Sequence, residues 1–439
     1  MKYKITLRDK LEHMVTKQGY SLSQFSKMSG INRGILSATL NGNPPKPISI
    51  KQLDQMTKAL GKEEGWLYEP FMNECFEDGK ANWRRVRSLL VRCVELELID
   101  ILKRTLYLLL ENLTYISYIF DLAEELYSNK HKDVSLYFYN CIIEHERDSH
   151  SERLAISQYR VFRHSIGIKL ENNFRAAIVF APFRHYLPPY LQLDALVHLS
   201  NISYTLQDWE NLKHYSDELN QAVKLMYNHR EHKYHQPERN LVVYYGKSYL
   251  LKLIALTNEK RYVEAEQLLQ NLQNFNYLKI DSDEEISEVK KFKLYAELHK
   301  YNLKLLQGDK TNLNDYVLLI KKHPKEQLAS LLVILKSSNL NNWDIDYLLK
   351  DFYSVIYPED IIEYLLSRYG VYYIETEISQ YISLYYEIAL YQCNKRKYDD
   401  KLEKILLALE STVTKYNKSR ILDCLELFKK LRLISKNGN

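Results

Sequence analysis

The side chains best suited to recognition chemistry lie between residues 32 and 41. Arg33, Ser37 and Asn41 recur at the four-residue spacing that places them along one stripe of a helix, and Asn32 and Gly34 lie beside it. A guanidinium can donate two hydrogen bonds to a guanine edge, and an amide side chain can pair with adenine. We expect Arg33 to read guanine, Asn32 to read adenine or contact a phosphate, and Ser37 and Asn41 to make weaker base or sugar contacts.

Two short helices joined by a tight turn must present that stripe. The first begins with S-L-S-Q, where Ser21 and Gln24 have the spacing of a capping box. Phe25 and Met28 are expected to place apolar groups on one side of this helix. Gly30 then supplies a turn position that tolerates a positive φ angle.

The second helix is expected to begin after Asn32 and to end at Asn41-Gly42. Its Leu36 and Leu40 recur at the i, i+4 spacing of a helix that faces a small core. The starts of both helices, at Ser21 and Asn32, offer backbone N–H groups to phosphates. Further phosphate contacts are expected from three lysines near the pair: Lys27, Lys46 and Lys51.

One apolar-periodic helix precedes this pair at residues 7–15, and another follows it at 50–60. This four-helix order resembles the lambda-repressor-like, or XRE-type, DNA-binding domain, and the ending GKEEGWLYEP resembles the usual end of that domain. The resemblance covers residues 4–70 and implies binding to a double-stranded, palindromic DNA operator. The chain departs from the family at Leu22, where a hydrophilic residue often touches DNA.

The charge distribution agrees with a basic N-terminal part. Residues 1–70 contain 11 Lys+Arg and 6 Asp+Glu, a net charge of +5. The remainder contains 61 − 11 = 50 basic and 56 − 6 = 50 acidic residues, so its net charge is zero. The excess positive charge that neutralises a phosphate backbone is therefore confined to the proposed DNA-binding part.

Length and composition indicate a chain of several domains. With 439 residues, 46% hydrophobic and 27% charged, we expect a soluble globular protein of more than one domain. We predict a cytoplasmic protein with no membrane partner, because no apolar run of transmembrane length and no signal segment is seen. The five cysteines, Cys75, Cys93, Cys141, Cys393 and Cys424, lack metal-like spacing and are expected to be reduced.

The chain beyond residue 82 reads as long helices joined by short polar loops. Only five of the 12 glycines lie after Gly79, which argues against a turn-rich β architecture. We predict an all-α protein with a DNA-binding domain at 1–70, a connection at 71–82 and a helical array at 83–439. Within the array, an aromatic residue repeatedly opens a helix after a polar turn, at Trp209, Tyr262, Trp343 and Tyr398.

The clearest of these copies joins Tyr245-Gly246 and Tyr249 to Tyr262 and Ala265. It resembles the small-residue-plus-aromatic signature of a tetratricopeptide repeat, and it implies a degenerate α-solenoid with a concave face. The irregular spacing of the copies leaves open a non-repetitive helical bundle.

Motifs for catalysis are weak. Gly246-Lys247-Ser248 ends like a phosphate loop but lacks the glycine that should stand at Leu241. The spacing from His145 to His150 does not fit a zinc motif. The series His229, His232 and His235 could line one helix face, but no carboxylate accompanies it and Pro237 follows. We therefore expect no enzymatic activity, no cofactor and no metal; a metal-dependent hydrolase at these histidines remains a minor alternative.

The combination of both parts resembles the peptide-pheromone receptors of Gram-positive bacteria, the Rgg, NprR, PlcR and PrgX group, and the arbitrium receptor of phages. This resemblance implies a homodimeric transcriptional regulator involved in quorum sensing, in which a short signalling peptide on the concave face alters dimer geometry and DNA binding. By repeat position, the inner-facing candidates for peptide binding are Asn201, Tyr204, Asn240 and Lys247. The alternative is a phage or plasmid repressor whose array binds a protein antirepressor across a flatter surface.

Overall fold

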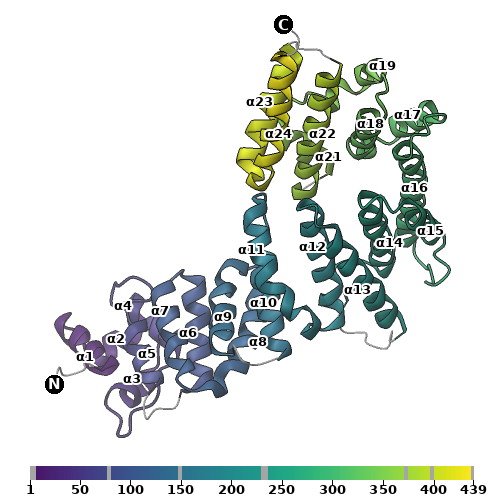
Figure 1. Cartoon of the computed structure of the whole chain (residues 1–439). Coiled ribbons are helices and arrows are strands. Elements are labelled where there is room, and N and C mark those ends of the chain that lie inside the picture. Colours follow the sequence, from purple (N-terminus) through teal and green to yellow (C-terminus); the bar gives the residue numbers. More distant parts are fainter. Residues whose placement is uncertain are drawn as a thin grey trace. The chain divides into compact units, whose positions relative to one another are not determined.

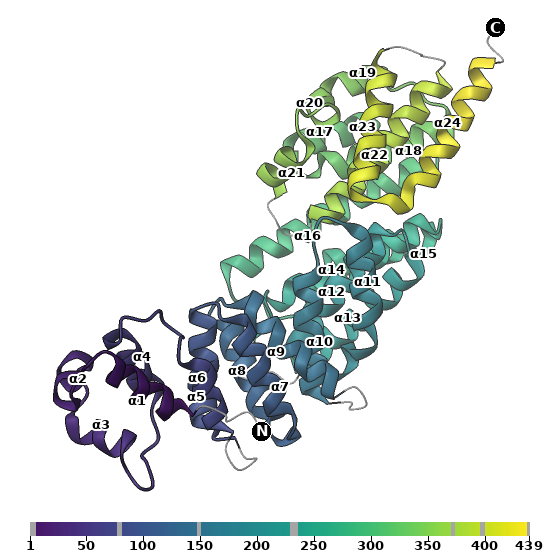
Figure 2. The same ribbon diagram turned by 90° about the vertical axis from the view of Figure 1, so that its left-hand side faces the viewer.

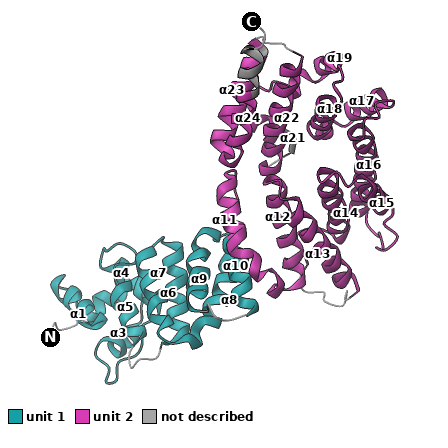
Figure 3. Cartoon of the chain, viewed as in Figure 1, with its two compact units in different colours: residues 1–161 teal, residues 162–439 magenta. Residues whose placement is uncertain are grey.

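Helices form every regular element in the described part of the computed structural model (Figures 1 and 2), which confirms the all-α prediction. The structure describes residues 6–76, 81–146, 151–228, 236–369, 374–395 and 400–436. The chain divides into two compact units, residues 1–161 and 162–439 (Figure 3). Among the described helices, none is long and apolar enough to cross a bilayer.

Unit 1 begins with five short helices followed by longer ones, and α10 continues from it into unit 2. The bounds are α1 Leu7–Lys17, α2 Leu22–Ser29, α3 Arg33–Leu40, α4 Ile50–Ala59, α5 Tyr68–Cys75, α6 Trp83–Glu95, α7 Ile99–Leu110, α8 Ile116–Ser128, α9 Lys132–His145 and α10 Glu152–Ser165, with a 3-10 turn at Leu113–Tyr115.

One hydrophobic core runs through unit 1, from Leu7 on α1 to Ile142 on α9. The segment 71–82, expected as a connection, contains most of α5, whose Phe71, Met72 and Cys75 are buried in this core. Helix α5 packs on α6 and α7. The first 70 residues therefore share their core with the helices that follow, and the compact units divide between residues 161 and 162.

A recurrent turn joins many of the helices. Glu97, Lys130, Gln207 and Lys260 have φ angles of 55°, 69°, 58° and 61°. In each case the next N–H donates to the carbonyl five residues earlier, as Arg261 does to Leu256 at 2.9 Å. This is the Schellman ending, for which glycine is the usual residue. In this chain, polar residues therefore occupy left-handed positions at helix ends where glycine is usual, so these turns cannot be recognised from glycine in the sequence.

Unit 2 contains mostly long helices, and its shortest ones lie between residues 346 and 369, before three long helices at the C-terminal end. The bounds are α11 Leu170–Phe180, α12 Pro189–Thr205, α13 Trp209–Asn228, α14 Leu241–Asn258, α15 Tyr262–Gln273, α16 Asp283–Leu306, α17 Leu313–Lys322, α18 Gln327–Asn341, α19 Asp346–Leu349, α20 Tyr353–Ile356, α21 Ile361–Tyr369, α22 Ile374–Asn394, α23 Asp400–Tyr416 and α24 Ile421–Lys436. Short 3-10 turns lie at Ala181–Tyr186, Pro324–Glu326, Lys350–Phe352 and Lys418–Arg420.

Alternate helices of unit 2 form a closed ring, which can be followed in Figure 1. Helix α12 packs on α14, α14 on α16, α16 on α18 and α18 on α22. Helix α22 returns to α12, where the Ser379 hydroxyl donates to the carbonyl of Thr205 at 3.4 Å. Helices α13, α15 and α17 each bridge two successive ring members. The five ring helices therefore surround a common interior.

Candidate functional site

The structure holds α3 with its recognition residues outward. Leu36 is fully buried and Leu40 is 8% exposed, whereas Asn32, Arg33 and Asn41 are exposed. Ser37 is half-buried at the edge of this face, and Gly34 is exposed beside it. Arg33 forms no hydrogen bond or ion pair with any residue that the structure describes. The guanidinium is therefore available to a partner from outside the chain.

The expected helix caps are confirmed. The N–H of Ser21 donates to Gln24 Oε1 at 2.8 Å, and the N–H of Gln24 donates to Ser21 Oγ at 3.3 Å. Gly30 ends α2 with a φ of 69°. Asn32 caps α3 by accepting the N–H of Gly34 on Oδ1 at 2.8 Å. Because this acceptor is used, Asn32 retains its amide donor and suits a phosphate contact better than bidentate pairing with adenine.

The two apolar residues expected on one side of α2 differ in burial. Phe25 is fully buried, whereas Met28 is 49% exposed. Residues three apart differ by 300° around a helix, which places them about 60° from each other, so Met28 lies on the same side as Phe25 but at the edge of the apolar stripe. Ser29, one residue further, is buried instead, and its hydroxyl donates to the carbonyl of Phe25 at 2.7 Å.

The loop after α3 folds back onto that helix. The N–H of Lys46 donates to the carbonyl of Ala38 at 2.9 Å. A Cβ at Gly42 would lie 2.3 Å from the same carbonyl oxygen, so only glycine permits this approach. The side chains of Lys27 on α2, Lys46 in this loop and Lys51 on α4 are all exposed.

A buried carboxylate ties this region to the rest of unit 1. Glu74 on α5, with a side chain 6% exposed, accepts from Arg8 at 3.4 Å and from Arg85 at 2.8 Å. Arg8 also donates to the carbonyls of Thr39 at 3.1 Å and Lys46 at 3.3 Å. The end of α3 and its loop are thus bound through α1 and α5 to α6.

Unit 2 contains a cavity of about 490 Å³ inside the ring of helices. All five ring helices contribute to its lining, together with Trp209 at the start of α13 and Tyr262 at the start of α15. The volume lies within the range of pockets that enclose small ligands, roughly 300–1,000 Å³. Its wall includes one carboxamide from each ring helix: Asn201, Asn258, Asn302, Asn339 and Gln380.

Several polar atoms of this wall have no hydrogen-bond partner in the described structure. They are Nδ2 of Asn201, Nδ1 of His299 and Oε1 of Gln380. Asn201 is only 4% exposed. A buried polar atom without a partner costs roughly 1–3 kcal/mol, which a ligand that supplies the missing bond would recover. The cavity is therefore prepared for a ligand that both donates and accepts hydrogen bonds.

Two of the four predicted peptide-binding residues line this cavity. Asn201 and Tyr204 are on α12, and burial raises the pKa of the Tyr204 hydroxyl, so it stays protonated at neutral pH. Asn240 caps α14 by accepting the N–H of Val243 at 3.2 Å, and neither it nor Lys247 is in the cavity lining. Lys247 is surrounded by charged groups, and burial followed by the charge of Arg239 lowers its pKa to about 8.

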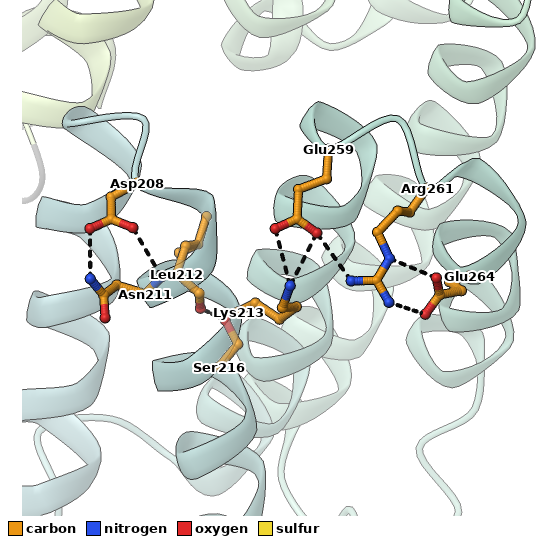
Figure 4. A network of polar contacts seen from close by, with 8 residues as sticks. All are labelled: Asp208, Asn211, Leu212, Lys213, Ser216, Glu259, Arg261 and Glu264. Carbon is orange, nitrogen blue, oxygen red and sulfur yellow. Dashed lines mark hydrogen bonds and ion pairs between the residues drawn. The ribbon is translucent and has the colours of Figure 1, made fainter.

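A network of ion pairs joins the helices that carry Trp209 and Tyr262 (Figure 4). Lys213 on α13 donates to Glu259 at 3.1 Å, and Glu259 also accepts from Arg261 at 3.2 Å. Arg261 pairs in turn with Glu264 at 2.6 Å. These contacts join α13 to the α14–α15 turn, next to the starts of the helices that carry Trp209 and Tyr262. These are two of the four aromatic residues that the sequence analysis singled out.

Charged cavity residues were missed at the sequence level. Lys336 on α18 and Glu326 just before it line the cavity, as does His299 on α16. Burial raises the pKa of Glu326 to about 7, and burial lowers the pKa of Lys336 and that of His299, the latter to about 4. These residues could be found from sequence only once the pairing of the ring helices is known.

The motifs set aside during sequence analysis have structural explanations where they are described. Gly246 lies within α14, where a Cβ would come within 2.4 Å of the Phe292 ring, so packing accounts for it. His229, His232 and His235 lie outside the described residues, as do His150 and Tyr398. In the described part, no group of three or more His, Cys, Asp or Glu side chains could hold a metal ion. All five cysteines are free thiols.

Comparison with protein-family models, curated proteins and solved structures found no match to this chain.

Proposed function

We propose that this chain is a sequence-specific DNA-binding regulator controlled by a short peptide. In this proposal α2 and α3 act as a helix-turn-helix that reads the major groove, as in the XRE-type domains that the sequence resembles. The ring of unit 2 acts as a tetratricopeptide-like array that encloses the peptide. The protein works as a cytoplasmic homodimer and is a binding protein, not an enzyme.

The cavity is the observation that carries this proposal. Each of its five wall helices contributes a carboxamide, from Asn201 on α12 to Gln380 on α22. A carboxamide has one acceptor and two donors, which match the C=O and N–H of a peptide unit. Asn258, Asn302 and Asn339 already form hydrogen bonds within the chain. Nδ2 of Asn201 and Oε1 of Gln380 have no partner in the described structure, and they suit a C=O and an N–H of an extended peptide backbone.

The exposed face of α3 supports the DNA-binding part of the proposal. Arg33 and Asn41 are exposed on a helix whose opposite face is buried, and the +5 net charge of residues 1–70 lies in the same segment. Because one module with few phosphate contacts binds weakly, two copies in register are needed for useful affinity. A peptide that changes the separation of the two copies would therefore change operator binding.

A protein antirepressor is the less favoured partner. It requires an extended, accessible surface, whereas the unpaired polar atoms of unit 2 lie inside a cavity of about 490 Å³. A folded protein cannot enter a space of that size, although a single segment of one could.

Native mass spectrometry of the protein purified from its own host tests the proposal. We expect a dimer that releases a peptide of about five to ten residues on mild denaturation; the resemblance to pheromone receptors implies this size. An Asn201→Ala variant purified in parallel should carry less of that peptide, because it lacks the buried donor in the cavity. The protein is purified both under conditions where it binds its operator and under conditions where it does not. A dimer that carries no peptide in either case would contradict the proposed control by a peptide.

A further inference from the structure

An isoleucine is exposed in the first turn of the helix that carries Arg33. Ile35 on α3 is 41% exposed, whereas Leu36 and Leu40 of the same helix are buried. Ile35 does not belong to the buried core that runs through unit 1. A β-branched residue also forms helix less readily than alanine, so neither packing nor helix formation accounts for this side chain.

The outward face of α3 is small at its centre and larger at its two edges. Successive residues are 100° apart around a helix, so Gly34 and Ala38 lie opposite the buried Leu36, and Arg33 and Ile35 lie on the two sides of Gly34. Gly34 is exposed and Ala38 is half-buried. A surface can therefore approach the backbone of α3 closely between the side chains of Arg33 and Ile35.

The charge around this face indicates what kind of surface approaches it. Between Glu12 and Asp54 the chain contains no acidic residue, and its five basic residues there are Lys17, Lys27, Arg33, Lys46 and Lys51. The matching partner is negatively charged and brings an apolar group to Ile35. In the major groove of DNA, phosphates supply the negative charge, and the 5-methyl group of thymine is the apolar group that the base edges display.

We propose that Ile35 recognises the 5-methyl group of a thymine in each half-site of the operator. This inference rests on the proposed DNA-binding function and specifies a base that α3 reads. Arg33 and Ile35 lie on opposite flanks of a helix about 10–12 Å in diameter, and base pairs are stacked about 3.4 Å apart. The thymine therefore lies within about three base pairs of the guanine that Arg33 reads.

Replacement of thymine by uracil tests this assignment, because deoxyuridine pairs with adenine but lacks the methyl group. The probe is the duplex that the unaltered full-length protein selects from a random library. Each thymine is replaced in turn, at the symmetric positions of both half-sites, and the affinity is measured by fluorescence anisotropy. We expect one position near the guanine to lose about fourfold in affinity for each half-site, roughly the value of one buried methyl group.

Matched variants assign this loss to Ile35. Ile35→Ala removes the side chain beyond Cβ and should bind the thymine and uracil probes equally at that position, as should Ile35→Ser. Ile178→Ala removes the same atoms from α11 of unit 2, where Ile178 is 58% exposed, and should keep the full discrimination. Because Ile35 lies outside the core, its variants should fold, which circular dichroism checks.

The outcomes separate this inference from the function on which it rests. If no uracil substitution lowers the affinity for the selected probe, or if Ile35→Ala discriminates as well as the unaltered protein, Ile35 does not read thymine and DNA binding stands. If no sequence is enriched from the library, both the inference and the proposed DNA-binding function are overturned.

Discussion

At the scale of residues, the proposed binding function depends on polar groups that have no hydrogen-bond partner in the described structure. Asn201, His299 and Gln380 each have a buried polar atom without a partner among the described residues, and the exposed guanidinium of Arg33 has none there either. In a chain selected for stability alone, such buried groups would be paired or replaced, because each buried polar atom without a hydrogen-bond partner lowers the free energy of unfolding. We therefore propose that the three buried positions recognise a partner outside the chain.

Glu326 provides a test of this view through pH. Its pKa is about 7 in the folded chain and 4.5 in its ordinary state, so the folded state binds the proton more tightly. The associated stability is fully present below pH 4.5 and is lost as the pH rises through 7. Glu326→Gln, which mimics the protonated form, should therefore become more stable than the unaltered protein by about 1–3 kcal/mol between those pH values.

Chemical denaturation of both proteins at pH 4.5 and at pH 8 measures this difference. The free energy of unfolding of both proteins is compared in the absence of added peptide. A difference between the two proteins that stays constant with pH would show that Glu326 is not held in the unfavourable environment that the structure describes.

At the scale of elements, the ring of unit 2 requires close contact between helices α14 and α16. Gly246 makes this possible because its missing side chain accommodates the ring of Phe292. Gly246→Ala should destabilise unit 2 by about 1–3 kcal/mol, the usual cost of adding volume to a packed core. Thermal unfolding followed by circular dichroism measures the loss.

Gly167→Ala is the matched control for that substitution. A Cβ at Gly167 would meet no atom within 4 Å, and its N–H bond to Asn173 is unaffected by a methyl group. The free energy of unfolding of this variant should lie within about 0.5 kcal/mol of that of the unaltered protein, as expected for a substitution away from packed features. Equal effects at Gly246 and Gly167 would argue against close packing of α14 on α16.

Short-range features of the elements could be predicted from sequence, whereas long-range ones could not. The capping box of Ser21 and Gln24, the turn at Gly30 and the cap at Asn32 depend on residues within four positions, and all are confirmed. The return of α22 to α12 brings together Thr205 and Ser379, which are 174 residues apart. No local pattern encodes that contact, and the cavity depends on it.

The same limit explains the mixed result for the predicted cavity residues. Helical periodicity and repeat position identified Asn201 and Tyr204, which line the cavity. These sequence patterns could not show that Asn240 caps its own helix or that Lys247 lies among other charged groups. Lys336 and Glu326 carried no local signal, because a lysine and a glutamate at helical spacing usually belong to a solvated face.

At the scale of the whole molecule, the account requires two copies of the basic region on one duplex. If Lys27, Lys46 and Lys51 each contact one phosphate in each copy, six phosphates are neutralised, and the logarithm of affinity should fall with the logarithm of salt with a slope of about −5. Fluorescence anisotropy with a labelled operator over a salt series measures this slope. Lys46→Ala should reduce its magnitude by about 2, one contact for each copy.

An exposed lysine outside the basic region serves as the control. Lys290 lies on α16 of unit 2, and Lys290→Ala should leave both the affinity and the slope unchanged. A slope near zero for the unaltered protein would contradict a phosphate-rich interface. An equal reduction of the slope by Lys46→Ala and Lys290→Ala would mean that the lysines around α3 have no special role.

Selection of DNA from a random duplex library by the full-length protein tests whether α3 reads DNA. The account predicts an enriched, two-fold symmetric sequence whose half-sites are about one helical turn, or a multiple of it, apart. Arg33→Ala should relax the preference for one guanine in each half-site at a cost of about 1–3 kcal/mol. Arg87→Ala, which removes an exposed ion pair with Glu125, should select the same sequence as the unaltered protein. Enrichment of no sequence, or of an identical sequence by Arg33→Ala, would contradict the assignment of α3 as the helix that reads DNA.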